Sequence, residues 1–277
     1  MSEKFLKVED LVVEYRTGGK VVHAVNNVSF ELERGKTLGL VGETGAGKTT
    51  IAKTILRVLP DAQAKVKSGK VILDGVDLLS LSEAAMRKVR GGQVTMVFQD
   101  PMTALNPIMK VGEQIAEVIR KHQTREDKTA REMAEDMLAM VGIPRERYGE
   151  YPHQFSGGMK QRVVIAMALA CNPHLLLADE PTTALDVTVQ AQIVKLLKRI
   201  NQKKGTAILF ISHDLSLVRR LCSRVIVMKD GRIVEQGAME DIFENPQQEY
   251  TQKLIAAIPR CVKKNSGRSA KTEEAHG

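Results

Sequence analysis

The alternation of apolar and polar positions divides the chain into three stretches. The first, up to about residue 110, combines alternating and β-branched apolar residues with one helix-compatible run that follows an apolar strand. Alternation with a period of two is typical of strands, and recurrence every three to four residues is typical of helices. The strands predicted here cover residues 11–15, 24–32, 37–41, 70–73 and 94–99, and the helix covers residues 50–58.

The second stretch is mostly helical, and the third returns to alternating strands and helices. Helices are predicted over 111–121, 125–141 and 158–170, with Pro107, Pro144 and Pro152 between them. Beyond residue 170, strands are predicted at 175–178, 206–211, 225–228 and 232–236, and helices at 187–202, 215–221, 239–244 and 248–258. The Asp230-Gly231 pair between two apolar runs indicates a β-hairpin.

These elements predict an α/β fold with an antiparallel β portion and a helical insertion at about residues 105–170. Alternating strands and helices are typical of a parallel sheet covered by helices. We assign residues 1–258 to this unit. Residues 259–277 have no apolar period and are predicted to be disordered.

Composition and charge exclude several classes of protein. The net charge of +8 raises the possibility of a nucleic-acid partner, but the basic residues are spread out, and only 4% of residues are aromatic, with no Trp. We therefore favour a solvated basic surface and predict no nucleic-acid binding. The three cysteines have no zinc-site spacing and suit a reducing compartment. No secretory leader is visible, and no apolar run approaches the ~20 residues that span a bilayer.

Residues 42–49 carry the strongest chemical signal. They read Gly-Glu-Thr-Gly-Ala-Gly-Lys-Thr and lie between the 37–41 strand and the 50–58 helix. Glycines let backbone N–H groups surround a phosphate at the positive end of the helix, where Lys48 adds charge and Thr49 a hydroxyl for Mg²⁺. A plain glycine turn is the alternative, which the strand and helix on either side disfavour. The predicted nucleoside triphosphate site comprises Gly42, Glu43, Thr44, Gly45, Ala46, Gly47, Lys48, Thr49 and Thr50.

Two carboxylates end the apolar run at residues 175–178. Asp179 is expected to hold Mg²⁺, directly or through water, and Glu180 to orient or deprotonate the attacking water. The alternative is a helix start, because Asp-Glu before Pro181 is also a good N-terminus. The position behind a buried strand favours the catalytic interpretation.

A second anion-binding element begins at Phe155. Ser156, Gly157 and Gly158 stand at the start of a helical run, where N–H groups and a hydroxyl are exposed. An ordinary N-cap is the alternative. Because only one glycine-rich loop with its lysine is present, the second element is predicted to serve the nucleotide of a partner.

Together these motifs resemble the nucleotide-binding subunit of ATP-binding cassette (ABC) transporters. Six motifs in the family's order, over about residues 5–258, carry the resemblance: Gly42–Thr49, Gln99, Phe155–Gln161, Leu175–Glu180, Thr183–Asp186 and His213. The segments 98–107, 155–159 and 179–190 are similar to the oligopeptide, dipeptide and nickel importer branch. The resemblance implies a P-loop NTPase of the ABC-ATPase fold, with an antiparallel β subdomain and an inserted helical subdomain.

The resemblance also implies roles for four further residues. Tyr15 lies where the family places an aromatic ring against adenine, although it could instead be an outward-facing strand residue. Gln99 would contact Mg²⁺ and water, and report to the membrane subunits, rather than merely close a strand. His213 would touch the γ-phosphate rather than cap a helix. Asp186 would join two such domains, a role compatible with capping the following helix.

As implied by the resemblance, two cassettes dimerise head to tail and sandwich ATP and Mg²⁺, hydrolyse ATP, and reopen. The expected function is ATP hydrolysis that drives uptake of a peptide-like solute, or of nickel or another small solute. The expected partners are a second cassette, identical or homologous, two membrane permease subunits and an external solute-binding protein. The chain would be a peripheral protein on the cytoplasmic face of the inner membrane, docked through about residues 100–112.

Departures from the family pattern modify these expectations. Phe155 and Met159 replace the leucine and glutamine of many relatives, but the peptide branch tolerates both. Many peptide-branch members carry clustered C-terminal cysteines for an iron–sulfur cluster. Cys261 is the only cysteine in this region, so no cluster is predicted, which weakens the case for a peptide solute. The alternatives are a soluble cassette ATPase acting on ribosomes or DNA and a non-catalytic binding module. The single cassette and the lack of sustained heptads argue against the first. The full set of catalytic residues argues against the second.

Overall fold

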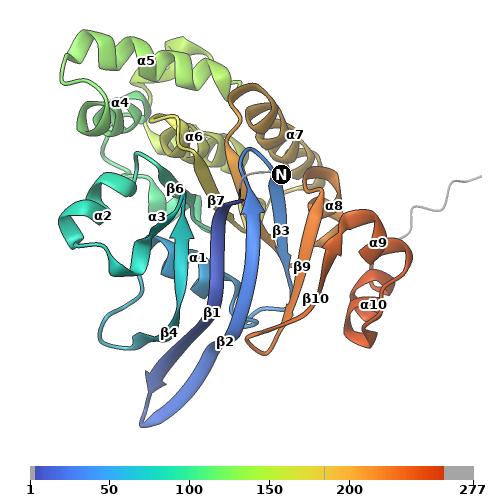
Figure 1. The fold of residues 1–277 in the computed structure, drawn as a ribbon. Coiled ribbons are helices and arrows are strands. Elements are labelled where there is room, and N and C mark those ends of the chain that lie inside the picture. Colours follow the sequence, from blue (N-terminus) through green and yellow to red (C-terminus); the bar gives the residue numbers. More distant parts are fainter. Residues whose placement is uncertain (1–3, 184, 259–277) are drawn as a thin grey trace, which may run out of the picture.

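Two sheets organise the chain in the computed structural model, which describes residues 4–183 and 185–258 (Figure 1). The smaller sheet is antiparallel, in the order β2-β1-β4-β5. Its first two strands form a hairpin that turns at Gly18 and Gly19, both with positive φ. The predicted disorder of 259–277 falls outside the described residues. The strands are β1 (Lys4–Thr17), β2 (Lys20–Glu33), β4 (Ala64–Leu73) and β5 (Val76–Asp77).

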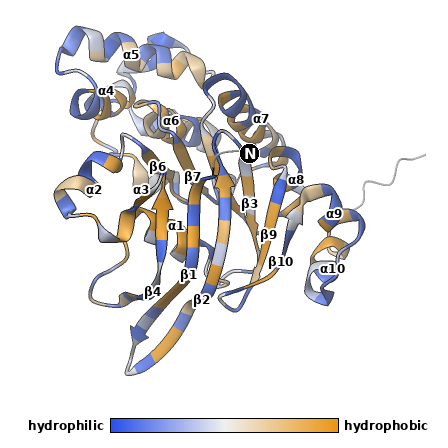
Figure 2. Cartoon of the chain, in the orientation of Figure 1, coloured by the Kyte–Doolittle hydropathy of each residue, from blue (hydrophilic) through white to orange (hydrophobic). Residues whose placement is uncertain are grey.

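The larger sheet has the order β10-β9-β3-β8-β7-β6, and β10 alone runs antiparallel to its neighbour. Every residue of β3, β6, β7 and β8 is buried, which is typical of parallel strands covered on both faces. Figure 2 shows the hydrophobic colour along β3 and β7. The strands are β3 (Thr37–Val41), β6 (Val94–Val97), β7 (Leu175–Asp179), β8 (Ala207–Ser212), β9 (Arg224–Lys229) and β10 (Arg232–Ala238).

Alternate residues of the parallel strands enter two separate cores. Leu175 and Leu177 of β7 belong to a core shared with the antiparallel sheet and α1 (Lys48–Leu56), whereas Leu176 and Ala178 face a core formed by later helices. These helices are α6 (Gly157–Leu169), α7 (Val187–Lys204) and α8 (Leu215–Leu221). The sheet is therefore packed on both faces, and its strand ends are held in fixed positions at one edge.

A group of helices is inserted between β6 and β7. It begins at α3 (Pro101–Ala104) and continues through α4 (Val111–His122), α5 (Asp127–Met140) and α6. Figure 1 shows α4 and α5 at the upper left, far from the C-terminal helices α9 (Met239–Glu244) and α10 (Glu249–Ala256). A further short helix, α2 (Glu83–Val89), follows β5. No described helix is both long enough and apolar enough to span a bilayer.

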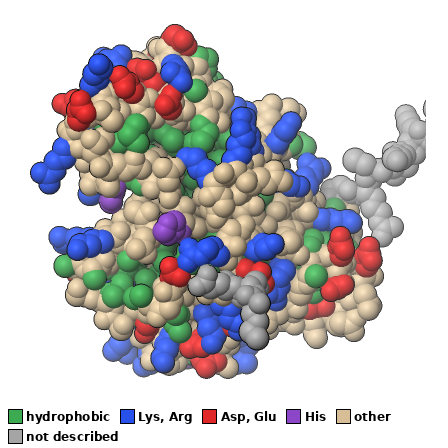
Figure 3. Space-filling model, turned by 45° about the horizontal axis from the view of Figure 1, so that its top comes forward, with side chains coloured by type: hydrophobic (Ala, Val, Ile, Leu, Met, Phe, Trp, Pro, Cys, Tyr) green, Lys and Arg blue, Asp and Glu red, His purple; other side chains and the backbone are tan. Residues whose placement is uncertain are grey.

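The elements match the predicted fold class, with two short α-helices, α2 and α3, and one short strand, β5, that the sequence pattern missed. The Asp230-Gly231 hairpin is confirmed, because both residues have the positive φ that the turn requires. Charges are mixed on the surface: on the face shown in Figure 3, Lys and Arg side chains alternate with Asp and Glu. That face presents no continuous basic stripe.

Candidate nucleotide-binding and hydrolysis site

The phosphate loop runs from the end of β3 at Val41 to the start of α1 at Lys48. Two of its positions accept only glycine. A Cβ on Gly42 would lie 2.2 Å from the Met228 carbonyl oxygen, and a Cβ on Gly47, where φ is +97°, would lie 2.2 Å from the Ala24 carbonyl oxygen. The loop is therefore fixed between the end of β9 and the first half of β2.

The start of α1 presents uncapped backbone groups to this loop. The residue before the helix, Gly47, provides no side-chain cap, so the first N–H groups of α1 are available to an anion. Lys48 is almost fully buried here, at 4% exposure. Its ammonium donates to the carbonyl oxygens of Gly42 at 2.6 Å and Glu43 at 2.8 Å. Burial lowers the pKa of Lys48, and the neighbouring carboxylates of Glu180 and Asp179 partly oppose this shift.

A hydroxyl and a carboxylate meet beside Lys48. Thr49 Oγ1, in the first turn of α1, donates to Asp179 Oδ1 at 3.0 Å, and Asp179 ends β7 at 2% exposure. Burial raises the pKa of Asp179; the Thr49 hydrogen bond opposes this and the Glu180 charge adds to it. Paired oxygen donors next to a phosphate loop are the ligands that Mg²⁺ prefers, so the donor set fits this ion.

Glu180 is the centre of a second cluster. It adopts a left-handed backbone conformation, with φ of +46°, which is unusual for a non-glycine residue. Its N–H donates to the Ile211 carbonyl of β8 at 2.9 Å. Two hydrogen-bond donors share its Oε2 atom, Gln99 Nε2 at 3.3 Å and Thr183 Oγ1 at 2.9 Å, and His213 Nδ1 lies 3.2 Å from the same atom. Within residues 4–183 and 185–258, no hydrogen bond or ion pair is found on Oε1.

Two partners of Glu180, Gln99 and His213, were predicted from the sequence, and each follows a strand of the parallel sheet. Gln99 lies two residues beyond β6, and His213 comes directly after β8. The His213 side chain is 55% exposed, in contrast to the 12% of Glu180. Because Nδ1 faces Glu180, Nε2 is the ring nitrogen left for another group. Thr183 was not predicted as a site residue, although its position three residues after Glu180 is a signal for such a contact.

The remaining residues of the predicted nucleotide site surround the loop. Glu43, Thr44 and Gly45 are exposed, whereas Ala46 and Thr50 are buried. Tyr15 is half-buried on β1, where it packs against the core below the antiparallel sheet and pairs across the strands with the exposed Val22. The Tyr15 ring therefore packs on the core with one side, and its contact with adenine stays a prediction.

The second anion-binding element begins α6. Ser156 is its N-cap, accepting from the Met159 N–H at 3.4 Å, and Asp186 caps α7 in the same way, accepting from the Val189 N–H at 2.9 Å. A Cβ on Gly158 would lie 2.5 Å from Val189 Cγ1, so glycine allows α6 to pack directly on α7. In the described part of the chain, no hydrogen bond or ion pair joins residues 156–158 to the phosphate loop.

One arginine contacts both departures from the usual family sequence. The Arg147 guanidinium lies 4.3 Å above the Phe155 ring and 3.3 Å from the Met159 sulfur, and it donates to the Gln154 carbonyl at 3.0 Å. Glu150 holds it in place through hydrogen bonds at 2.5 and 2.8 Å. Phe155 and Met159 thus form one packed unit with Arg147 beneath the start of α6.

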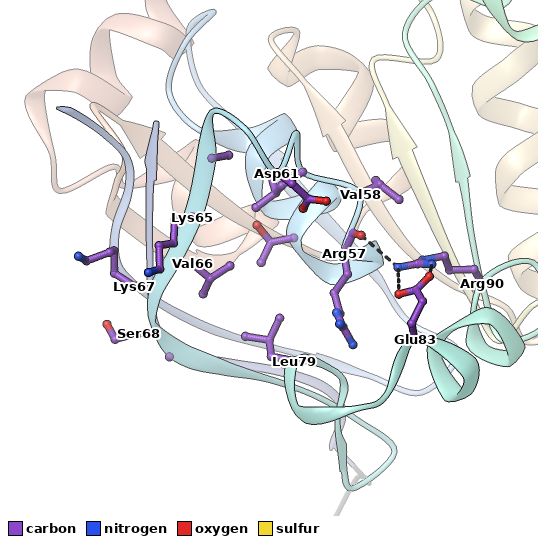
Figure 4. Close-up of a pocket in the computed structure, with 14 residues that line it drawn as sticks. Arg57, Val58, Asp61, Lys65, Val66, Lys67, Ser68, Leu79, Glu83 and Arg90 are labelled. Carbon is purple, nitrogen blue, oxygen red and sulfur yellow. Dashed lines mark hydrogen bonds and ion pairs between the residues drawn. The ribbon is translucent and has the colours of Figure 1, made fainter. Parts of the chain in front are cut away.

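A hollow of about 800 Å³ lies at the opposite end of α1, between that helix, β4 and α2 (Figure 4). The side chains of Lys65 and Lys67 point away from it, and Arg90 pairs with Glu83 at its edge. The Arg90 guanidinium also donates to the carbonyl oxygen of Leu56 at 2.7 Å, which caps the C-terminus of α1. We assign this region to support of α1 and not to nucleotide binding.

Comparisons with known proteins show the family to which the chain belongs. The ABC transporter family model matches residues 25–183, and the model for the C-terminal region of oligopeptide/dipeptide transporters matches residues 234–276. The chain is 49% identical to the oligopeptide transport ATP-binding protein OppD of Bacillus subtilis, over 92% of this chain and 72% of the relative. It is 48% identical to the dipeptide transport ATP-binding protein DppD of the same organism, over 93% and 78%.

Solved structures give the same answer. The dimeric post-hydrolysis state of the ATP-binding cassette MJ0796 bound to ADP and Pi matches with a TM-score of 0.76 and 29% identity, over 84% of this chain and 98% of that one. CbiO1 from Clostridium perfringens, part of the ABC transporter complex CbiONQ, also matches at 0.76 and 29%, over 88% and 92%. The chain belongs to the ABC transporter family, and the predicted ABC-ATPase fold and ATP hydrolase class are confirmed. The individual residue roles stay predictions.

Proposed function

We propose that this chain is the ATP-hydrolysing subunit of an ABC importer for peptides. It works with a second cassette, identical or homologous, two membrane permease subunits and an external solute-binding protein, on the cytoplasmic face of the cell membrane. Support comes from the relatives, whose names specify oligopeptide and dipeptide transport, and from the match to the C-terminal region of such transporters. Nickel is disfavoured because these relatives are peptide transporters. The names of the relatives favour a peptide solute more strongly than the scarcity of C-terminal cysteines argues against it.

The observation that carries the proposal is the separation of two half-sites. Thr49 donates to Asp179, and Lys48 is influenced by the charges of Asp179 and Glu180, whereas in the described residues no hydrogen bond or ion pair joins Ser156–Gly158 to the phosphate loop. Each element alone offers only part of the donor set that a triphosphate needs. Two copies placed head to tail let one chain's α6 complete the other chain's loop. The γ-phosphate then gains charge-assisted hydrogen bonds from both chains, which favours the closed pair.

Residues from the start of α1 and from the ends of β6, β7 and β8 would hold Mg²⁺ and prepare the water. Thr49, Asp179 and Gln99 supply oxygen ligands for the ion, whose charge would offset that developing on the phosphates. With Oε2 of Glu180 held by Gln99 and Thr183 and faced by His213, its Oε1 is the atom left to accept the proton of the attacking water. His213 Nε2, the ring nitrogen not facing Glu180, is the one that would contact the γ-phosphate.

An apolar groove beside Gln99 is our candidate for docking of a permease helix. It has a volume of about 470 Å³ and is lined by residues of β6, α3, α4 and α6, among them Phe98, Val118 and Met167. Phe98 is 44% exposed and Ile108, on the following loop, is 84% exposed. A helix seated here would touch the segment that carries Gln99, and so would respond to changes at Glu180.

The test is uptake by the assembled complex. The chain is purified with its permeases and partner cassette, reconstituted in proteoliposomes, and supplied with ATP and a peptide-loaded receptor. Uptake of labelled oligopeptide or dipeptide that is lost in Lys48→Ala supports the proposal. Uptake of labelled Ni²⁺ but not of peptide would refute the peptide assignment. Sedimentation with ribosomes or DNA, with no association with a permease, would refute the transport role.

A further inference from the structure

The C-terminal helix α10 contacts the phosphate loop through one side chain. The Tyr250 hydroxyl accepts a hydrogen bond from the Glu43 backbone N–H at 3.2 Å, across 207 positions of sequence. Tyr250 is half-buried, and burial raises its pKa, so the hydroxyl is neutral at physiological pH. The contact thus links the second residue of the nucleotide loop to the region that follows the catalytic core.

The peptide group between Gly42 and Glu43 is bonded at both ends. Its carbonyl oxygen accepts from Lys48 Nζ at 2.6 Å, and its N–H donates to Tyr250. In a trans peptide these two groups point in opposite directions, so Tyr250 lies on the side away from Lys48. The Glu43 carbonyl is held as well, by Lys48 Nζ at 2.8 Å and by the Ala46 N–H at 3.2 Å. Glu43 is accordingly tied on both sides.

The surroundings fix the position of Tyr250. The Glu235 carboxylate on β10 accepts from the N–H groups of Gln247 at 2.8 Å and Gln248 at 3.2 Å, and so holds the start of α10. The ammonium of Lys229 lies 5.0 Å from the Tyr250 ring centroid, within the range of a cation–π contact. Lys229 also follows Met228, whose carbonyl oxygen lies against Gly42. The β9–β10 hairpin therefore places both the loop and the residue that holds it.

We infer that Tyr250 is a positioning residue for nucleotide binding, which holds the phosphate loop from behind and couples α10 to occupancy of the site. The inference rests on the proposed binding of ATP by this loop. A loop already held in its binding conformation loses less conformational freedom when the phosphates arrive. Because binding free energies are reciprocal, nucleotide must in turn stabilise the position of α10.

Tyr250→Phe tests this with the smallest change, since it deletes only the hydroxyl and keeps the ring beneath Lys229. Loss of one neutral hydrogen bond predicts an approximately fivefold increase in the Kd of ATP. The matched control is Tyr148→Phe, which deletes a hydroxyl that donates to Glu113 at 2.8 Å in the helical insertion. Both variants are made in the Glu180→Gln background for calorimetry and in the native background for kinetics.

The expected result for Tyr250→Phe is a higher Kd and KM for ATP with kcat within about twofold of wild type. Hydrogen exchange of α10 is expected to slow when ATP is added to the wild-type chain, and much less in Tyr250→Phe. Tyr148→Phe should leave the Kd unchanged. An unaltered or lower Kd in Tyr250→Phe, or an equal increase in Tyr148→Phe, overturns the inference while the proposed function stands. Failure of the wild-type chain to bind ATP overturns both.

Discussion

The geometry around Glu180 makes a sharp prediction for the Glu180→Gln variant. In the wild type, two hydrogen-bond donors and the His213 ring converge on Oε2, and Oε1 is left for water. The glutamine amide can place its oxygen at the Oε2 position and keep both hydrogen bonds, from Gln99 and Thr183, and the contact with His213. Its NH₂ group then occupies the Oε1 position, where it donates to the water and cannot accept a proton. The fold and the nucleotide contacts are retained, and only proton acceptance is lost.

The magnitude follows from this single lost function. General base catalysis contributes about 10²- to 10⁴-fold to a rate, so the kcat of Glu180→Gln is expected to fall by that factor with little change in Kd. Stability should not fall, because the Glu180 charge raises the pKa of buried Asp179 and its removal relieves that repulsion. Glu180→Ala is the matched comparison. It leaves the donors of Gln99 and Thr183 without their acceptor, so it should also lose about 1 kcal/mol of unfolding free energy.

The assay is phosphate release at saturating ATP, with bound ATP counted by filtration and unfolding followed in urea. The reasoning is refuted if Glu180→Gln hydrolyses ATP within about tenfold of the wild-type rate, because general base removal cannot be that mild. It is also refuted if Glu180→Gln is destabilised as much as Glu180→Ala, because the amide oxygen would then not hold the Gln99 and Thr183 donors.

Two further substitutions probe the packing and the charges of the site. Gly158→Ala places a Cβ 2.5 Å from Val189 Cγ1, so ATPase activity should fall about a hundredfold while ATP binding to the isolated chain persists. The double variant Gly158→Ala/Val189→Ala removes the clash and should recover phosphate release. Absence of recovery would contradict the packing argument. Because burial raises the pKa of Asp179, its charged form opposes folding at neutral pH, and this opposition disappears as the pH falls through the raised pKa. Asp179→Asn should therefore raise the unfolding free energy of the nucleotide-free chain at neutral pH, and this increase should become smaller at acidic pH. Urea titrations at neutral and acidic pH measure both values. A lower unfolding free energy of the variant at neutral pH would contradict the prediction.

The sequence identifies the parts of the site that are local in the chain. The phosphate loop, the Asp179-Glu180 pair and the start of α6 each lie within a few residues of a strong apolar run, so pattern and spacing locate them. The same holds for the Asp230-Gly231 turn, where the residue types specify the backbone angles. The six ordered motifs were sufficient to identify the family and the fold.

The contacts between distant segments could not be derived in this way. Periodicity does not say which strands are neighbours, so the placement of β6, β7 and β8 side by side, which brings Gln99 and His213 onto one oxygen of Glu180, is information from the fold. The Tyr250–Glu43 contact joins residues 207 positions apart. The beginning of β1 was missed for another reason, because its register shifts between Val8 and Leu11 interrupt the alternation that marks a strand.

The central claim is that one ATP is held by two cassettes, and the most direct measurement is ATPase activity per chain as a function of cassette concentration. Light scattering on the same samples gives the oligomeric state. A monomeric chain is expected to be nearly inactive. Activity per chain is expected to rise when a second cassette is added, either another copy of this chain or a homologue, provided that its residues corresponding to Ser156–Gly158 are intact. A strictly monomeric chain that hydrolyses ATP at the full rate would contradict the account.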